Sequence, residues 1–345
     1  MHARAPAAGR ARTRGPAAVT WGLVLGLGLA AAVGLSLAVG TKGIPLATVL
    51  DALTAFDPGN TEHLIVSERR VPRTLAGLLV GAALGLAGAL IQGLTRNPLA
   101  DPGIFGVNAG AALFVVLGIA VFGVSSLAGY VWFGFLGAAA ASVVVYTIGS
   151  MGRGGASPLK LALTGAALTA ALTSLISAVL LTDPAVHDRF RFWQVGTLAG
   201  RDLEIVGQAL PFLVVGIVGA LLLGKVLNGL SLGDDVARAF GRNTTTDRVL
   251  CGAAVVVLAG AATALAGPIT FLGLAVPHLA RMLAGPDYRR ILPLSLLIGP
   301  VLLLLADVLG RVVARPGEVQ AGVVTALLGA PVLVLLVRRR KPASL

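Results

Sequence analysis

The residues of this chain best able to do chemistry are a group of arginines and one buried acid. Arg69, Arg70 and Arg73 stand together at the start of a long apolar run. Guanidinium groups pair with carboxylates through two parallel hydrogen bonds. Asp307 lies deep in another apolar segment, where an ionised group is costly and is therefore a candidate for function. Arg311 follows one helical turn later, so we expect it to neutralise Asp307.

The arginines at 69–73 allow two interpretations. They could meet carboxylates on a protein partner, or their long side chains could reach lipid phosphates at the membrane surface. The residues by themselves leave both interpretations open.

Covalent chemistry is not expected from this chain. The sequence has no Ser/His/Asp grouping, no His-Glu-x-x-His motif and no paired carboxylates within an apolar segment. The stretch from Gly219 to Lys225 matches the phosphate-binding loop motif except at its last position. Val226 stands there, where the motif requires a magnesium-binding Ser or Thr. The single cysteine, Cys251, and four scattered histidines predict no metal site. We therefore expect no enzyme, no bound metal and no cofactor on this chain.

The composition indicates an integral membrane protein. Hydrophobic residues make up 56% of the chain and charged residues 12%, against about 25% charged residues in soluble domains. The net charge of +12 is explained by membrane topology, so we do not expect a nucleic-acid partner. Gly77, Gly81 and Gly85 share one helix face and predict close helix packing.

A membrane-spanning helix needs about 20 apolar residues, and the chain offers ten such segments. The eighth is short and contains Pro277, so it is expected to be broken or tilted, and the third and fourth are expected to form a tight hairpin. The ten predicted spans are 17–40, 71–93, 106–123, 127–149, 159–182, 205–224, 247–266, 269–284, 292–313 and 320–337.

The distribution of basic residues predicts the orientation. With the N-terminus in the cytoplasm, 18 of the 27 lysines and arginines fall on the inner side. This predicts an all-α polytopic protein with a cytoplasmic tail at 1–16, one ten-helix domain at 17–340 and both termini inside. Outer segments 41–70 and 183–204 are long enough to be structured. The inner segment 225–246 is expected to form short amphipathic helices, which could bind a soluble partner or simply be solvated.

Several motifs, in order, resemble one transporter family. They are Arg70-Val-Pro-Arg73, Gly88-Ala-Leu-Ile-Gln92-Gly, Asn97-Pro-Leu-Ala-Asp-Pro102, Gly267-Pro-Ile-Thr-Phe-Leu-Gly-Leu-Ala-Val-Pro277-His-Leu-Ala-Arg281, Ala306-Asp-Val-Leu-Gly-Arg311 and Gly322-Val-Val-Thr-Ala-Leu-Leu-Gly-Ala-Pro331. Over about residues 20 to 340 the chain is similar to the FecCD-type permeases of ABC importers for iron-siderophores, vitamin B12 and haem.

The resemblance implies a fold like the vitamin B12 importer permease and a set of partners. It implies a dimer, either of two identical chains or with a paralogous permease, around a central pathway in the bacterial cell membrane. It also implies two cytoplasmic ATPase subunits, which hold ATP and Mg, and an extracytoplasmic substrate-binding protein.

The resemblance also assigns roles to residues. Arg70, Arg73 and Arg311 match positions that meet acidic residues of the binding protein. The loop between spans six and seven matches the coupling helices that contact the ATPase, and Ser157, Pro158 and Leu159 match an inner gate more loosely. The coupling residues are Leu230, Leu232, Asp234, Asp235, Ala237, Arg238, Phe240 and Gly241.

The expected function is that of the permease subunit of an ATP-driven importer for a ferric siderophore. Haem and cobalamin remain alternative substrates, because their permeases share these motifs. A distant alternative is an ion-coupled secondary transporter, which would need inverted repeats and ion sites near the middle of the membrane. Neither feature is visible in the sequence.

Overall fold

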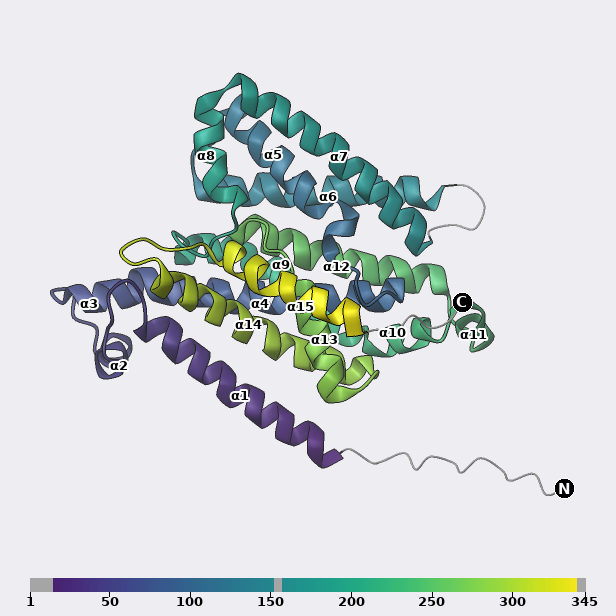
Figure 1. The fold of residues 1–345 in the computed structure, drawn as a ribbon, viewed down its shortest axis with the longest axis horizontal. Coiled ribbons are helices and arrows are strands. Elements are labelled where there is room, and N and C mark those ends of the chain that lie inside the picture. Colours follow the sequence, from purple (N-terminus) through teal and green to yellow (C-terminus); the bar gives the residue numbers. More distant parts are fainter. Residues whose placement is uncertain (1–14, 152–156, 340–345) are drawn as a thin grey trace.

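The computed structural model describes residues 15–151 and 157–339, and within these ranges it contains helices and no strand. Each of the ten predicted spans corresponds to one helix (Figure 1). These helices are α1 (Gly15–Ala38), α4 (Val71–Thr95), α5 (Val107–Phe122), α6 (Leu127–Ser150), α7 (Pro158–Thr182), α9 (Leu203–Leu222), α12 (Thr244–Ala266), α13 (Leu272–Ala284), α14 (Tyr288–Val313) and α15 (Ala321–Arg339).

Seven of the described helices are long and apolar enough to cross a membrane. The other three are the shorter apolar helices α5, α13 and the Ala321–Pro331 part of α15. The sequence predicts that the eighth span is broken or tilted at Pro277. The break does not occur, because α13 continues through Pro277, and the tilt stays a prediction. That helix is short instead because it begins only at Leu272, after Phe271 adopts a left-handed conformation with φ of 66°.

Short helices fill the segments between the spans. The outer segment 41–70 holds α2 (Leu46–Thr54), α3 (Thr61–Leu64) and the π-helical η1 (Ile65–Arg70), which runs directly into α4. The segment 183–204 holds α8 (Pro184–Gln194), and the 3₁₀ helix η2 (Pro102–Phe105) precedes α5. The predicted short helices in 225–246 are α10 (Gly224–Ser231) and α11 (Asp234–Ala239).

Helix α4 lies at the centre of the bundle (Figure 1). It packs mainly against α14, α12 and α13, whereas α1 lies along one edge and α5 to α8 form a group on the other side. The predicted glycine face makes these contacts. A Cβ atom at Gly81 would lie 2.6 Å from the Cα of Pro300, and one at Gly77 would lie 2.6 Å from Leu304. Small residues therefore let the backbones of α4 and α14 approach closely.

The helices place the candidate residues at two opposite ends of the molecule (Figure 1). The arginine end consists of α2, α3, η1 and the loop 314–320 between α14 and α15. The α10–α11 end also carries the start of α12 and the end of α4. Helices α1 and α15 respectively begin and end on this second side, as an even number of crossings requires.

Candidate functional site

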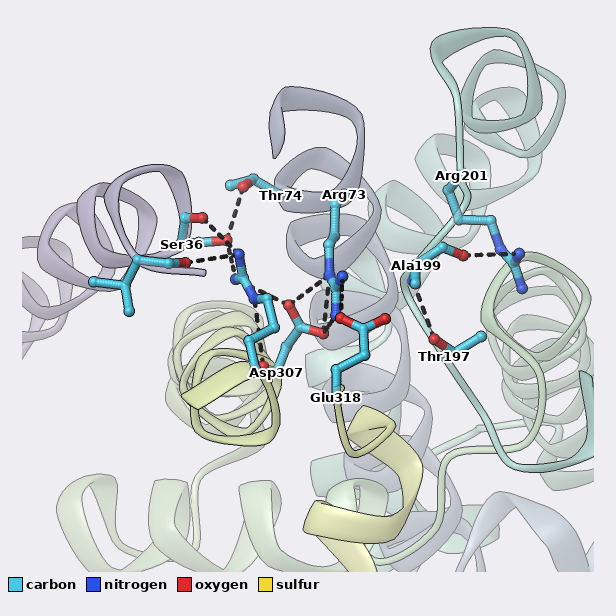
Figure 2. Close-up of polar contacts among 10 residues, drawn as sticks. Ser36, Arg73, Thr74, Thr197, Ala199, Arg201, Asp307 and Glu318 are labelled. Carbon is cyan, nitrogen blue, oxygen red and sulfur yellow. Dashed lines mark hydrogen bonds and ion pairs between the residues drawn. The ribbon is translucent and has the colours of Figure 1, made fainter. Parts of the chain in front are cut away.

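Asp307 is the centre of the polar network at the arginine end (Figure 2). Its side chain has no exposed surface. Arg73 donates to its carboxylate from Nε at 2.9 Å and from Nη2 at 2.8 Å. Arg311 lies one turn along α14, and its Nη2 is 3.0 Å from Oδ2 of Asp307. The predicted pairing of Asp307 with Arg311 is confirmed, and Arg73 from α4 is an additional partner.

Arg73 also binds a second carboxylate. Its Nη1 donates to Oε2 of Glu318 at 2.8 Å. Glu318 belongs to the loop 314–320, so this guanidinium joins α4, α14 and the connection to α15. The three groups are drawn together in Figure 2.

Arg70 and Arg311 both hold the carboxyl end of α1. The last carbonyl groups of a helix have no partner within it, so another donor must satisfy them. Arg311 Nη1 donates to the carbonyls of Ser36 and Val39, each at 2.9 Å. Arg70 donates to the carbonyls of Leu37 and Lys42. The arginines therefore attach a helix that otherwise buries little surface, since only 11% of its apolar window is buried.

These contacts bear on the predicted docking role of the three arginines. The side chains of Arg73 and Arg311 are 12% and 4% exposed, and Arg70 is buried. The guanidinium groups thus bind atoms of this chain. For Arg70 and Arg73, neither of the two sequence interpretations predicted such internal partners. Arg315 adds a fourth guanidinium, which donates to the carbonyl of Gly40 at 2.7 Å. Two of the four guanidiniums, Arg73 and Arg311, pair with carboxylates and the other two bind carbonyls, so the cluster keeps a surplus of positive charge. Docking through it stays a prediction.

Sequence reasoning missed two members of this network, Glu318 and Ser36. Glu318 lies three residues from Arg315 in a short loop, but its sequence neighbours do not indicate a pairing with Arg73. Ser36 shares a hydrogen bond of 2.8 Å with Thr74 and also accepts from Arg311. A lone serine in an apolar run gives no signal of this kind without the neighbouring helices.

A separate arginine, Arg201, closes the end of α12. It is 5% exposed and donates to the carbonyls of Leu265 and Ala199. Burial lowers the pKa of Arg201 to about 10, and the nearby Asp202 partly opposes this shift. The side chain therefore stays protonated at neutral pH and satisfies a terminal carbonyl of α12.

The predicted coupling residues lie on and around α11. Leu230 and Ala237 are buried and anchor the loop, whereas Leu232 and Phe240 are 62% and 77% exposed. Val236 of α11 is 43% exposed, and Gly233, with φ of 101°, separates α11 from Leu232 at the end of α10. Asp234 and Asp235 begin α11, and the side chain of Arg238 on this helix is exposed. Gly241 follows the end of α11 and has a φ of 75°. The three exposed apolar side chains Leu232, Val236 and Phe240 are termed here the α11 row, and their role in binding a partner stays a prediction.

Polar contacts fix this loop to the bundle. Asn228 of α10 donates from Nδ2 to Asp287 at 2.6 Å and accepts from the backbone NH of Tyr288 at 2.9 Å. Burial raises the pKa of Asp287, but the hydrogen bonds from Asn228 and Arg289 outweigh it, and the pKa is lowered. Arg242 and Asp247 form a two-bond ion pair at 2.7 and 2.9 Å. Asn228 therefore connects α10 directly to the start of α14, and the Arg242–Asp247 pair connects the loop to α12.

The predicted inner gate forms the start of α7. Ser157 is the N-cap, and its side chain accepts from the backbone NH of Lys160 at 3.3 Å. Pro158 occupies the first turn, and Leu159 is 69% exposed. The structure therefore assigns these residues a capping geometry, and a gating role stays a prediction.

The described residues contain no cluster of three or more His, Cys, Asp or Glu side chains that could hold a metal ion. Two apolar cavities lie between helices. One of about 300 Å³ lies between α6 and α12, and one of about 190 Å³ is lined by α13, α14 and α15. Their linings are overwhelmingly apolar, so they resemble gaps in helix packing more than sites for a charged ligand.

Comparison with known proteins places this geometry in a family. Residues 28–339 match the FecCD transport family. The chain belongs to the FecCD transport family. The ferric enterobactin transport system permease protein FepD of Escherichia coli (strain K12) is 50% identical over 303 residues, covering 88% of this chain and 90% of FepD. The probable siderophore transport system permease protein YfiZ of Bacillus subtilis (strain 168) is 43% identical over 300 residues, covering 87% of this chain and 90% of YfiZ.

The fold of this FecCD chain also matches a solved structure. A metal-chelate type ABC transporter in an inward-facing conformation superposes with a TM-score of 0.80 at 29% identity, covering 94% of this chain and all of the other. Two further relatives come from one system of Escherichia coli (strain K12). The Fe(3+) dicitrate permeases FecC and FecD are 42% and 38% identical, each over 84% of this chain, and cover 89% and 90% of those proteins. The predicted all-α permease fold is confirmed.

Proposed function

We propose that this FecCD permease forms the membrane pathway of an ATP-driven importer for a ferric siderophore. The observation that carries the proposal is the 50% identity with a ferric enterobactin permease over nearly the whole of both chains. Other similar permeases are named for ferric citrate and iron-hydroxamate, so the shared substrate class is an iron chelate. Iron is cargo in this proposal and has no resident site on the chain.

The proposed orientation places the α10–α11 end in the cytoplasm of a bacterial cell membrane. The excess of basic residues predicted for that side supports it. An ATPase subunit, carrying ATP and Mg, would then bind the α11 row, and an extracytoplasmic binding protein would dock at the arginine end. The surplus positive charge around Arg73 suits acidic residues of such a protein.

We further propose that two permeases assemble around the pathway. The naming of FecC and FecD as two permeases of one transport system supports a paired arrangement. The apolar lining of the cavities within this single chain also favours a pathway between two chains. The partner can be a second copy or a paralogue.

Uptake of radiolabelled iron tests the function. The chain, expressed with its neighbouring ATPase and binding protein in a bacterium lacking its own siderophore permeases, should restore accumulation of ⁵⁵Fe-enterobactin. Haemin and labelled cyanocobalamin serve as the alternative substrates. Restored uptake of either of these, without ferric enterobactin or another ferric siderophore, would overturn the substrate assignment. Uptake that continues with a catalytically dead ATPase would instead indicate a secondary transporter.

The Phe240→Ala substitution tests the ATPase contact. Phe240 is 77% exposed, so its removal should leave the fold intact while deleting an aromatic anchor of the α11 row. Aromatic anchors at interface centres contribute about 2 kcal/mol or more, so we expect ATPase binding to weaken about thirtyfold. Binding to the detergent-purified ATPase measures it. Phe192→Ala in α8, 59% exposed at the opposite end, is the matched control, and equal affinities for both variants would contradict the contact.

The Asn228→Ala substitution tests how the loop is joined to the bundle. It removes both hydrogen bonds between α10 and the start of α14 and leaves Asp287 without its side-chain donor. We expect ATP hydrolysis in the assembled transporter to persist while substrate uptake per ATP falls several-fold, because motion of α10 no longer reaches α14. Asn243→Ala, at the cap of α12, removes a polar group without touching α14 and serves as the comparison. Unchanged uptake per ATP would show that coupling takes another route.

A further inference from the structure

The two carboxylates bound by Arg73 differ in how firmly they are held (Figure 2). Asp307 receives bonds from Nε and Nη2, is carried by helix α14 and has no exposed surface. Glu318 receives one bond, from Nη1, and 31% of its side chain is exposed. Asp307 is therefore a fixed part of the site, whereas Glu318 occupies a position that solvent and solutes reach.

Glu318 is one of few contacts that hold the loop 314–320. Arg315 also bonds to the carbonyl of Gly40 at 2.7 Å, and the backbone NH of Val319 bonds to Gly310 at 3.0 Å. The carbonyl of Gln320 accepts from the first turn of α15, and Gly322 in that turn bonds to the carbonyl of Gly196 at 2.9 Å. Residues 315–317 are exposed. Helix α15 begins at Ala321, three residues after Glu318. The bond between Arg73 and Glu318 therefore ties the start of α15 to the central helix α4.

The charge around this position favours a further carboxylate. Arg73 and Arg311 pair with Asp307 and Glu318, whereas Arg70 and Arg315 hydrogen-bond to backbone carbonyls. The nearby Glu62 attracts Arg70, but its carboxylate forms an ion pair with Lys42. An incoming carboxylate that replaces Glu318 keeps the Nη1 group of Arg73 paired. The displaced Glu318 enters water in an exposed loop, where an ionised group has its ordinary hydration.

We propose that Glu318 is an exchangeable occupant of a carboxylate-binding position on Arg73. A carboxylate of the docking protein takes this position and thereby releases the loop around Glu318, which leads into α15. The proposal rests on docking at the arginine end, as set out above, and adds the residue through which docking reaches the bundle. Glu318, which lies outside the family motifs, thereby positions the loop that leads into α15.

Thermodynamic reciprocity makes the exchange measurable. If carboxylate binding releases Glu318, then removing the charge of Glu318 must strengthen carboxylate binding and loosen the loop without any ligand. If electrostatic attraction alone acts, removing any nearby acid should strengthen binding of the carboxylate. Binding of the carboxylate should then leave the mobility of the loop unchanged. Loop mobility therefore separates exchange from attraction.

The test uses the full chain, assembled with its ATPase in lipid nanodiscs. Hydrogen–deuterium exchange is followed at the amides of 314–323 for the wild type, Glu318→Gln and Glu62→Gln. Glu62 is the matched control because it is an ion-paired acid at the same end, with a side chain 29% exposed. The probe is a hexaglutamate peptide at millimolar concentration, with hexaglutamine as its neutral counterpart.

We expect Glu318→Gln to speed exchange of the loop on the order of fivefold or more and Glu62→Gln to leave it unchanged. Hexaglutamate, but not hexaglutamine, should speed exchange in the wild type and add nothing in Glu318→Gln. A loop that is equally protected in wild type and Glu318→Gln would overturn the proposal. So would a wild-type loop that stays protected with hexaglutamate present. The iron-uptake experiment is independent of these readouts, so failure of the exchange and failure of the proposed function are distinguishable.

Discussion

Replacing Asp307 with alanine should lower the free energy of unfolding by about 3–5 kcal/mol, the range found when one partner of a buried ion pair is removed. Asp307 has no exposed surface and neutralises both Arg73 and Arg311, which are 12% and 4% exposed. Without it, the buried Arg311 loses its carboxylate and Arg73 keeps only the partly exposed Glu318. The measurement is the thermal or denaturant unfolding of the purified chain in detergent, together with its yield in membranes.

The control for this prediction is Asp188→Asn. Asp188 is 69% exposed in a surface ion pair with Arg191 at 3.5 Å, and such pairs contribute about 0–1 kcal/mol. A double variant, Asp307→Leu with Arg73→Met, should recover part of the lost stability, since apolar groups can replace a buried ion pair. If Asp307→Ala unfolded no earlier than Asp188→Asn, the network would not be a stabilising element.

A single methyl group at Gly88 is the second change expected to have a large effect. A Cβ atom there would lie 1.8 Å from the carbonyl oxygen of Gly273 and 2.5 Å from its carbonyl carbon. Both obstacles are backbone atoms at the start of α13, so no side-chain rotation relieves the overlap. We expect Gly88→Ala to cost about 3 kcal/mol or more, because the contact between α4 and α13 must open. Unfolding in detergent and the yield of protein from membranes measure this effect.

Gly26→Ala in α1 is the matched control for Gly88→Ala. No atom outside its own helix lies within 4 Å of a Cβ at Gly26. This control should be neutral or slightly stabilising, since alanine favours a helix over glycine by up to about 1 kcal/mol. Equal stability of the two variants would show that α4 and α13 are less closely packed than described.

The sequence alone predicted ten apolar segments, and each of them is a helix in the described structure. Apolar runs of about 20 residues leave few choices in a membrane, because an unsatisfied backbone group in lipid costs several kcal/mol and a helix satisfies its own. The glycine face of α4 was also readable, since Gly77, Gly81 and Gly85 repeat at helical spacing. The pairing of Asp307 with Arg311 followed from their separation on one helix turn.

The start of α13 was less predictable. Hydropathy places its beginning near residue 269, but the turn from Gly267 to Phe271 delays the helix to Leu272. Pro277 suggested a break that does not occur. A proline or glycine shows where a helix can end. It does not show whether packing against neighbouring helices allows the helix to continue.

Only the tertiary structure decided which groups the arginines bind. Arg73 meets Asp307 and Glu318 across more than 230 positions of sequence, and Arg311 meets the end of α1 across about 275. Spacing along one helix predicts contacts within a turn, whereas these contacts depend on how α1, α4 and α14 cross. The sequence therefore determined that charge would gather at this end of the molecule. The crossing of the helices determined that the charge is shared inside the chain, with Glu318 at its exposed edge.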